Sequence, residues 1–365
     1  MAKSEPPRPS TSPRGEIDLE CWERLMASVL HVTECYDGGT GRAMVARVRA
    51  APQHTHHVLW AGAEAPSEAD GWASVTKLPL GFIRRVRAVQ RKIAELSPDI
   101  VHAHSSWAGV YTRAFKTHVP IVYEAHCFKF EDPTTTKILR KAVWAAEARL
   151  ARCTSAIGVL SPYEAEIAHS FLSDAAIIEI PNLPTITTAV DARTKRVSRG
   201  AISMVGRISS QKDPRFFLAV REEISRIVPG LEYRWIGDGD PVLRRELEAA
   251  GVKVTGWLST DEVRESLTTS AVYLHTAAYE GFPLSVLDAA FCQVPIVVRR
   301  IPSMAHTTLR LADDVGDAAE AVVEMYTSDD AHMLAQNANS DLLRQMSMSS
   351  LESSLESLYT VALIR

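Results

Sequence analysis

The chain has 365 residues, of which 46% are hydrophobic and 23% are charged, and its formal net charge at pH 7 is -4. This length is sufficient for two domains with separate cores, and the near balance of charge argues against a nucleic-acid-binding protein. No apolar run is long enough to predict a membrane-spanning helix. The five cysteines are odd in number and scattered, with no Cys-x-x-Cys spacing, which indicates a reducing, cytoplasmic compartment without disulfides or a zinc site.

Residues 1–25 are rich in proline, serine and arginine and show neither helical nor strand periodicity. They lack the apolar core of a signal peptide, so we expect a flexible tail and not a targeting sequence. An alternative is that translation begins at Met26, directly before the first strand. In both cases the folded part is expected to begin at residue 26.

The first predicted strand, residues 28–33, runs into a glycine-rich turn at residues 37–41 (DGGTG) and an amphipathic stretch from Arg42. Such a turn lets a ligand approach the backbone, so that amides at Gly38 and Gly39 can face an anion or a sugar. The alternative is a turn that needs glycine only for steric reasons. The spacing is not that of the dinucleotide-binding fingerprint.

Short apolar runs then alternate with helix-length amphipathic segments, which predicts a parallel sheet covered by helices on both faces. We assign residues 26–184 to this first domain. The predicted strands are 56–60, 99–104, 120–124, 156–160 and 177–180, and the predicted helices are 82–96, a helix from residue 107, and 134–152.

Three histidines, His102, His104 and His126, fall at or just beyond the carboxyl ends of predicted strands. Ligands of parallel sheets bind at these ends, so the three imidazoles could face a cleft. The more usual role of such a histidine is a packed, hydrogen-bonded core residue, and we favour that role for His102. A metal site at His102 and His104 is not expected because no third ligand is evident.

The segment from residue 81 to residue 152 is basic, with 13 lysines and arginines against 6 aspartates and glutamates. Residues 82–87 (FIRRVR) and 137–141 (KILRK) place these cations beside apolar side chains on predicted helices. Such helices suit an anionic membrane surface or a lipid phosphate, and the protein would then be peripheral to a membrane. The alternative is the ordinary charged surface of solvated helices.

Residues 185–200 are polar and are predicted to form the linker to a second α/β domain, residues 201–350. The first strand of this domain, residues 201–205, runs into Gly206 and Arg207, and Lys212 lies just ahead of the next helix. A guanidinium and an ammonium that meet in one loop at the end of a strand suit a diphosphate.

The second domain repeats the alternation of the first, which predicts a second parallel sheet. After residue 298 we expect only helices, the last of them at residues 351–365. The further predicted strands are 232–236, 252–257, 271–275 and 294–298, with a helix at 259–267.

Residues 279–290 (YEGFPLSVLDAA) lie between two of these strands and predict a loop followed by a helix. Pro283 suits the first helical position, since its missing N–H needs no partner there. Glu280 then lies in the loop and Asp288 inside the helix, about 12 Å apart along its axis and about 80° apart in direction. With the positive helix end between them, the two carboxylates could hold two hydroxyl-rich groups joined by phosphate, as in a sugar nucleotide. The alternative is an ordinary buried unit with two surface acids.

The order of three motifs resembles that of the retaining glycosyltransferase family 4. The motifs are a strand followed by Gly-Arg-x4-Lys, a Gly-Asp-Gly turn at residues 237–239, and Glu-x7-acid. The resemblance covers most of residues 26–365 and is densest at 201–300. It implies the α/β fold called GT-B, in which two Rossmann-like doubly wound parallel-sheet domains face each other across a cleft. The last helix of this family commonly crosses back to the first domain, as residues 351–365 could.

The resemblance also implies roles for individual residues of the second domain. Arg207 and Lys212 would hold the donor diphosphate, Glu280 would contact the donor sugar, and Asp288 would contact the ribose hydroxyls. The base would be recognised through the backbone. The remaining contacts to the nucleotide sugar would come from Gly206, Gly256, Trp257, Gly281, Phe282, Pro283 and Leu284.

From the first domain, Gly38 and Gly39 would reach the donor, and His126 would lie beside the reacting sugar. Two positions depart from the family pattern. Asp288 is one methylene shorter than the usual glutamate, which would lengthen its ribose contact or route it through water. Pro283 replaces a common glycine and removes one amide donor.

The resulting hypothesis is a retaining glycosyltransferase that moves a sugar from a nucleotide diphosphate to a hydroxyl acceptor. The resemblance also implies that no metal or other cofactor is needed. The basic first domain favours a cell-envelope, exopolysaccharide or lipid-linked glycan as acceptor, reached at the inner face of the membrane. Three alternatives are a GT-B epimerase or phosphorylase-like enzyme, a non-catalytic nucleotide-binding protein and, least consistent with the motifs, a dinucleotide-dependent oxidoreductase.

Overall fold

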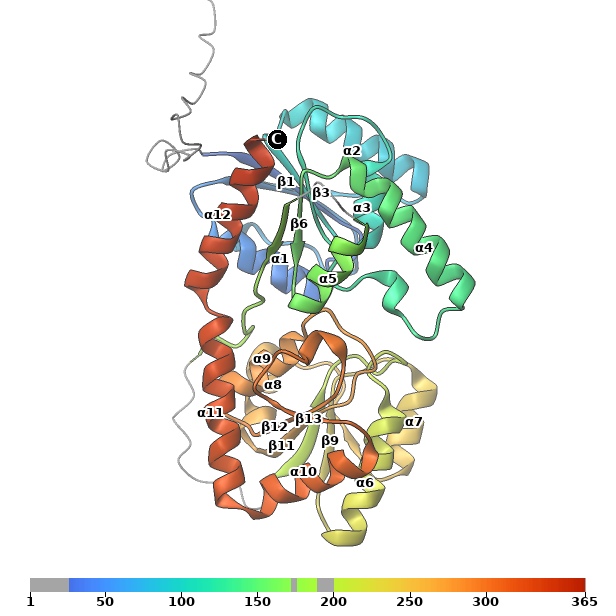
Figure 1. Cartoon of the computed structure of the whole chain (residues 1–365), viewed down its shortest axis with the longest axis vertical. Coiled ribbons are helices and arrows are strands. Elements are labelled where there is room, and N and C mark those ends of the chain that lie inside the picture. The colour runs from blue at the N-terminus through green and yellow to red at the C-terminus, as the bar shows by residue number, and fades with distance from the viewer. Residues whose placement is uncertain (1–25, 172–175, 189–199, 365) are drawn as a thin grey trace, which may run out of the picture.

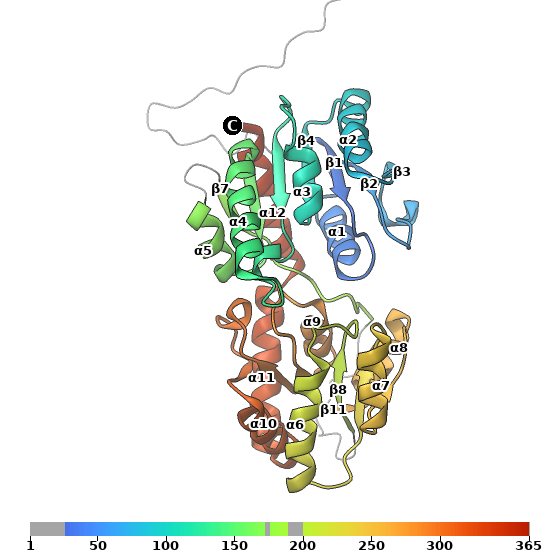
Figure 2. The same cartoon turned by 90° about the vertical axis from the view of Figure 1, so that its right-hand side faces the viewer.

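The computed structural model describes residues 26–171, 176–188 and 200–364. These residues form two α/β domains stacked along the long axis of the molecule, each built on one parallel sheet with helices around it (Figure 1, Figure 2). The predicted fold class is therefore confirmed. The predicted tail, residues 1–25, and most of the predicted linker lie outside the described residues.

Within the described chain, the sheet of the N-terminal domain has seven parallel strands in the order β3-β2-β1-β4-β5-β6-β7. The strand order reverses between β1 and β4, where open parallel sheets form their ligand cleft. The sequence analysis missed β3 at the sheet edge, because three of its four residues are polar, none is buried, and they form no apolar run. The strands are β1 (Ser28–Thr33), β2 (Thr55–Trp60), β3 (Ser74–Lys77), β4 (Ile100–His104), β5 (Ile121–Glu124), β6 (Ala156–Val159) and β7 (Ala176–Glu179).

Two hydrophobic layers lie on the two faces of this sheet. The first helix and the C-terminal helix bury one face, and the other helices of the domain bury the opposite face. The bounds of α2 agree with the predicted range, since its heptad-like apolar pattern is regular. The helices are α1 (Gly39–Ala50), α2 (Phe82–Leu96), α3 (Ser106–Arg113), α4 (Lys137–Leu150) and α5 (Pro162–Phe171).

The helix α1 begins inside the glycine turn, at Gly39 and not at Arg42. Gly38 precedes it with a φ of 68°, a left-handed value that favours glycine. A Cβ on Gly41 would lie 1.9 Å from the carbonyl oxygen of Tyr36, so only glycine fits there. Close approach of the backbone therefore explains part of the glycine-rich turn.

The sheet of the C-terminal domain has six parallel strands among the described residues, in the order β10-β9-β8-β11-β12-β13. The expectation of helices alone after residue 298 was wrong, because a short strand, β13, extends the sheet there. The predicted strand 252–257 is reduced to two residues, since Gly256 turns the chain with a φ of 75°. The strands are β8 (Ala201–Val205), β9 (Tyr233–Ile236), β10 (Lys253–Val254), β11 (Ser270–His275), β12 (Ile296–Arg299) and β13 (Arg310–Ala312).

The helices of this domain begin at well-defined caps. Asp213 and Asp240 cap helices that have proline in the first turn, and Ser259 forms a capping box with Glu262. Pro283 was predicted as the first helical residue, but its ψ of 120° makes it the residue before the helix. The helices are α6 (Pro214–Ile227), α7 (Pro241–Ala249), α8 (Thr260–Thr268), α9 (Leu284–Phe291), α10 (Val315–Thr327) and α11 (Asp329–Gln345).

The last helix, α12 (Met348–Ile364), leaves the C-terminal domain after α11 and runs along the N-terminal domain (Figure 1). Its buried residues repeat at helical spacing and pack on the same sheet face as α1. They are Leu351, Leu355, Leu358, Tyr359 and Ala362. The chain therefore crosses between the domains twice.

We expect Leu355→Ala to lower the free energy of unfolding by about 2–5 kcal/mol, because it removes a fully buried side chain from the contact of α12 with the N-terminal sheet. Urea denaturation followed by circular dichroism measures this change. Glu352→Ala, on the exposed face of the same helix, should change it by less than about 0.5 kcal/mol. Equal effects of the two substitutions would contradict this account of α12.

Candidate active site between the domains

The segment from Tyr279 to Asp288, here called the donor loop, joins β11 to α9 at the face of the C-terminal domain that meets the N-terminal domain. A Cβ on Gly281 would lie 3.0 Å from Leu160 Cδ1 and 3.1 Å from the backbone nitrogen of Cys127. The side-chain amide of Asn182 donates to the Phe282 carbonyl at 2.9 Å. The donor loop is therefore held directly against residues of the other domain.

Glu280 and Lys212, two predicted site residues from separate parts of the sequence, form an ion pair in the donor loop region. The other carboxylate oxygen of Glu280 accepts a hydrogen bond of 3.3 Å from the Gln211 side chain. His275 Nε2 lies 4.0 Å from the same carboxylate. The ammonium and the carboxylate therefore neutralise each other.

Gly206 and Arg207 follow directly after β8. Gly206 has a φ of 152°, and a Cβ there would lie 3.0 Å from Lys212 Cε, which brings Lys212 against the end of the strand. The Arg207 side chain is exposed and has no ion pair with any residue that the structure describes. Its positive charge acts on Cys35 of the other domain, where burial raises the pKa of the thiol and Arg207 opposes the rise. Among the described residues, Arg207 is thus a cation without an ion pair, and it faces the N-terminal domain.

Asp288, the second predicted acid, is only 3% exposed. Its Oδ1 accepts hydrogen bonds from the backbone N–H groups of Thr185, at 2.6 Å, and Ile186, at 3.1 Å. Its Oδ2 accepts one hydrogen bond of 2.8 Å from the Thr185 hydroxyl. Burial raises the pKa of this carboxyl, and the three donors oppose the rise. In this structure Asp288 therefore holds the beginning of the interdomain linker.

The other predicted contact residues lie at three places around the donor loop. Gly39 faces it from α1, since a Cβ there would lie 3.6 Å from Leu284 Cδ1, whereas Gly38 has open space around it. Phe282 and Pro283 are buried within the loop. Gly256 lies after β10 beside Asp238, and the Trp257 side chain next to it is 65% exposed.

His126 lies at the N-terminal-domain side of this boundary, directly before Cys127. Both residues have positive φ values, 55° and 113°, so the backbone is strained where it meets the donor loop. The His126 side chain is 9% exposed. Burial lowers its pKa to about 4, and the neighbouring Glu124 opposes this shift.

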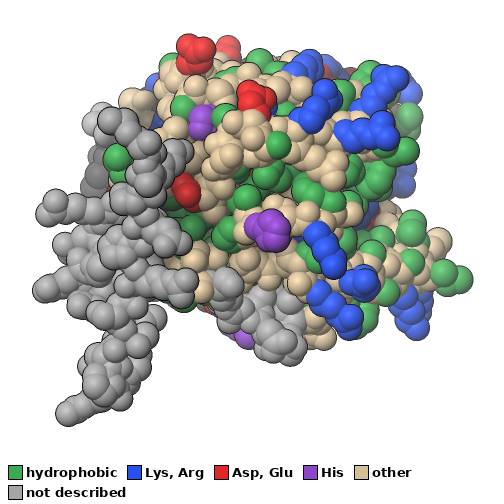
Figure 3. Space-filling view, turned by 90° about the horizontal axis from the view of Figure 1, so that it is seen from above, with side chains coloured by type: hydrophobic (Ala, Val, Ile, Leu, Met, Phe, Trp, Pro, Cys, Tyr) green, Lys and Arg blue, Asp and Glu red, His purple; other side chains and the backbone are tan. Residues whose placement is uncertain are grey.

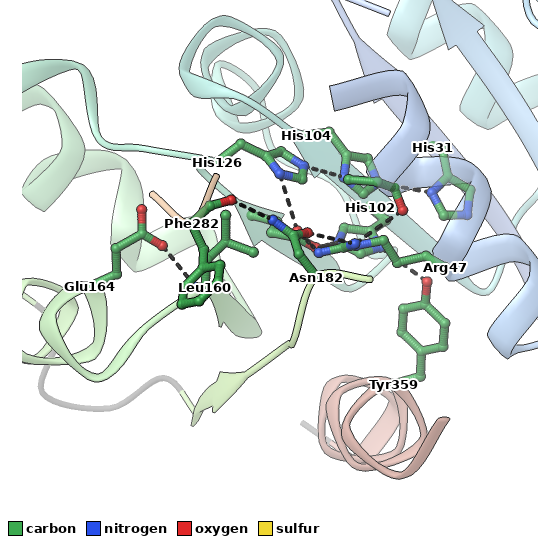
Figure 4. A network of polar contacts seen from close by, with 12 residues as sticks. His31, Arg47, His102, His104, His126, Leu160, Glu164, Asn182, Phe282 and Tyr359 are labelled. Atoms are coloured by element: carbon green, nitrogen blue, oxygen red, sulfur yellow. Dashed lines mark hydrogen bonds and ion pairs between the residues drawn. The ribbon is translucent and has the colours of Figure 1, made fainter. Parts of the chain in front are cut away.

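His104 does not line the cleft, because it is fully buried between His126 and His31 (Figure 4). His102 is also buried and takes the core role favoured from the sequence: its Nδ1 lies 3.0 Å from the Tyr359 hydroxyl of α12. Parallel register places His31 beside His102 and His104 beside Glu124.

A buried charge network that the sequence analysis missed surrounds these histidines (Figure 4). The Arg47 guanidinium donates to both oxygens of Glu124, at 2.5 and 3.2 Å, and to Asn182 Oδ1 at 3.1 Å. Both charged side chains are fully buried, and Arg47 contributes to holding the pKa of Glu124 well below its usual value despite desolvation. Two features of the sequence could have indicated this network: Arg47 lies on the inner face of α1, and Glu124 ends a buried strand.

Two groups of side chains are close enough to be considered as metal ligands, with all ligand atoms within 4.8 Å: His31, His102 and His104, and His104, Glu124 and His126. A third imidazole is thus present beside His102 and His104, which the sequence did not reveal. Ring nitrogens within these groups already pair with one another at 2.9 and 3.1 Å, so an ion could bind there only by breaking these contacts. The adjacent Arg47 charge disfavours a cation further.

A small cavity of about 20 Å³ lies between the domains beside Cys127, Tyr279 and Glu280, with room for about one water molecule. Glu164 lines it, and burial raises the pKa of this carboxyl to about 7. One of its oxygens accepts from the Leu160 N–H at 2.8 Å, whereas Oε1 has no hydrogen bond to the described residues. Glu164 is a further acid at the boundary that sequence reasoning did not identify.

Each of the two domains matches a known protein-family model. The family model described as "Glycosyl transferase 4-like domain" matches residues 19–182, and the one described as "Glycosyl transferases group 1" matches residues 199–328. Together the two models span both sheets and the donor loop.

Two curated relatives illustrate the sequence similarity. An Escherichia coli protein, the UDP-Gal:alpha-D-GlcNAc-diphosphoundecaprenol alpha-1,3-galactosyltransferase, is 27% identical over 229 residues, which are 56% of this chain and 58% of that protein. A 2-deoxystreptamine N-acetyl-D-glucosaminyltransferase from Niallia circulans is 21% identical over 258 residues, 62% of this chain and 66% of that protein. The matches cover less than two thirds of each relative.

Solved structures show the same fold. A sucrose-phosphate synthase from Thermosynechococcus elongatus superposes with a TM-score of 0.77 at 14% identity, covering 92% of this chain and 98% of that chain. Anabaena HepE in complex with UDP-glucose gives a TM-score of 0.74 at 16% identity, covering 92% and 100%. On the family models for both domains and the GT-B architecture, the chain belongs to the glycosyltransferases of family 4.

Proposed function

We propose that this protein is a retaining, metal-independent glycosyltransferase that moves a sugar from a nucleotide diphosphate sugar to a hydroxyl acceptor. The observation that carries the proposal is the meeting of Lys212, Glu280 and the start of α9 at the domain boundary. The names of the two curated relatives, both sugar transferases, support it, and HepE was solved with UDP-glucose bound.

In the proposed donor complex, the diphosphate lies between Arg207, Lys212 and the positive end of α9. Lys212 exchanges its bond to Glu280 for one to the diphosphate, which frees the Glu280 carboxylate for the hydroxyls of the sugar. These cations and the helix end take the part that a metal ion has in other transferases, since they stabilise the charge that develops on the leaving group.

The remaining donor contacts follow from the positions of the other groups. Asp288 Oδ2 accepts one hydrogen bond from the linker. In the proposed complex the same oxygen accepts a second hydrogen bond, from a ribose hydroxyl. Gly256 and Trp257 supply backbone to the base, whereas Gly38 and Gly39 face the donor from the other domain.

In the proposed reaction, the bond between the sugar and the diphosphate breaks first and gives an oxocarbenium-like sugar. The acceptor oxygen attacks the same face, and its proton passes to an oxygen of the departing diphosphate. Closure of the domains excludes water from this step.

The acceptor side has an exposed basic and apolar surface, here called the α2–α4 patch. Arg84, Arg87 and Arg91 of α2 line a shallow groove, and large apolar side chains of α2 and α4 are exposed. Figure 3 shows basic and hydrophobic side chains gathered along one side of this end of the molecule. The exposed apolar residues include Phe82, Ile83, Ile138, Leu139 and Trp144.

None of the described helices is long and apolar enough to cross a membrane. A surface with cations beside exposed apolar side chains suits peripheral binding to anionic lipids. We therefore assign the α2–α4 patch to the inner face of the cytoplasmic membrane, with a lipid-linked or other envelope glycan as the acceptor.

Nucleoside diphosphates should raise the thermal stability of the protein, with a preference for one base. At a ligand concentration one hundred times Kd, the gain in free energy of unfolding is about 2.7 kcal/mol. Arg207→Ala should lose most of this shift because it removes a guanidinium assigned to the diphosphate. Arg215→Ala, which removes an exposed arginine of α6, is the control. Absence of a shift with every nucleotide would remove the donor-site assignment.

Lys212→Ala should lower kcat by about 10²–10³, equivalent to about 2.7–4 kcal/mol, because a preorganised charge at the leaving group is lost. Steady-state transfer assays with the donor identified above measure this. Lys253→Ala, at an exposed lysine of the same domain, should leave kcat unchanged. Near-normal turnover of Lys212→Ala would show that Lys212 does not stabilise the leaving diphosphate.

Replacing Arg84, Arg87 and Arg91 by glutamine should weaken binding to phosphatidylglycerol vesicles by about two orders of magnitude, since each cation near such a surface contributes about 1 kcal/mol. Vesicle co-sedimentation at low and high salt measures the binding. Replacing Arg215 and Arg226, exposed on α6, by glutamine is the control. Binding that is unchanged in the triple variant, or insensitive to salt, would rule out the α2–α4 patch as the membrane contact.

A further inference from the structure

Three buried histidines, His56, His31 and His104, and the partly buried His126 form a continuous chain of polar contacts through the N-terminal domain, here called the histidine chain. Figure 4 shows the part of this chain from His31 to His126. Four of its contacts measure 2.9, 2.9, 2.9 and 3.1 Å, and the last, from His126 Nδ1 to Glu124 Oε1, measures 3.3 Å. In order, the chain runs from the Ala51 carbonyl through His56, His31, His104 and His126 to Glu124.

Counting protons shows that this chain is incomplete when all four rings are neutral. Both of its ends, a backbone carbonyl and a carboxylate, can only accept hydrogen bonds. Five contacts therefore need five protons, whereas four neutral imidazoles supply four. One contact must lack a proton, and its position decides the tautomer of every ring.

The geometry places the missing proton at the contact between His126 and Glu124. Glu124 cannot supply it as a carboxylic acid, because the two bonds from Arg47 keep the carboxylate ionised. The contact is also the longest of the five, and it belongs to the least buried ring of the chain. Every ring then carries its proton on Nε2, and His126 Nδ1 is bare.

The side branch through His102 has no such deficit. His102 Nδ1 lies 3.0 Å from the Tyr359 hydroxyl, and its Nε2 lies 3.5 Å from Glu124. The hydroxyl and the neutral ring together supply two protons for these two contacts. The deficit is therefore a property of the histidine chain and not of the buried network as a whole.

Burial and neighbouring charges have opposite effects on the protonation of His126. His126 faces His102 and His104 of β4, Glu124 of β5 and Arg47 of α1. Burial lowers the pKa of His126 to about 4, and Glu124 acts against that shift. His126 directly precedes Cys127, which contacts the donor loop at Gly281. An anion bound at the donor loop would add its attraction to that of Glu124.

We propose that the histidine chain takes up one proton from solvent at His126 Nδ1 when a nucleoside diphosphate enters the cleft. This inference rests on the proposed function. The uptake completes all five contacts and gives His126 a positive charge beside the leaving diphosphate, where it stabilises the developing negative charge. His56, His31 and His104 are positioning residues, since they set the tautomer of His126 through the chain.

The count leads to a test at the far end of the chain. His56→Leu leaves three rings and three contacts, so three protons suffice and all of them point towards Glu124. His126 then changes from the Nε2–H to the Nδ1–H tautomer, although the substitution lies at the opposite end of the chain. His57→Leu is the matched control, because His57 lies on the same strand but pairs with Ser74.

Two-bond proton–nitrogen correlation spectra of nitrogen-15-labelled histidine distinguish the two tautomers and the cation. We expect the Nε2–H form for His126 in the wild type and in His57→Leu, and the Nδ1–H form in His56→Leu. A wild-type His126 in the Nδ1–H form would overturn the proposal without any variant. An unchanged tautomer in folded His56→Leu would do the same.

Calorimetric titration with UDP in two buffers of different ionisation enthalpy measures proton uptake directly. Wild type and His57→Leu should take up close to one proton per UDP, and His56→Leu should bind UDP without uptake. Binding without uptake in the wild type would overturn this inference alone. Absence of binding of every nucleoside diphosphate, tested in the same way with all three proteins, would overturn the proposed function and the uptake with it.

Discussion

The buried ion pair between Arg47 and Glu124 connects more parts of this structure than any other contact described above. Both side chains are fully buried, and loss of one partner from such a pair typically costs about 3–5 kcal/mol. Glu124 faces His126, and Arg47 bonds Asn182, which in turn donates to the Phe282 carbonyl. One charge pair thus joins α1, β5, the beginning of the linker and the donor loop, so the geometry of the domain boundary depends on it.

The proposed donor site has most of its charges paired with one another or with neighbouring donors. Lys212 is bonded to Glu280, and Asp288 is bonded to Thr185 and Ile186. A ligand would therefore exchange partners with groups that are already held in place, and little reorganisation would be needed at the moment of reaction.

Elements with strong local signals could be predicted well. The bounds of α2 and β8 agree with the sequence expectation because each is a regular amphipathic or apolar run between clear breaks. The short edge strand β3 and the three-residue β13 could not be found, since pairing with a neighbour and not their own residues makes them strands. The start of α9 was predicted one residue too early, at Pro283, because proline suits both the first helical residue and the extended residue before it.

The sequence by itself determined the two parallel-sheet domains, the order of motifs around Arg207, Lys212 and Glu280, and the resemblance to a transferase family. These depend on periodicity and on short spacings, which are local. Only the tertiary structure decided that Asp288 holds the linker and that Glu124 pairs with Arg47. The partners in those contacts are 77 to 103 residues apart in the chain, and the histidine chain spans four strands. Contacts between distant segments depend on strand order, register and helix docking, and no local pattern records them.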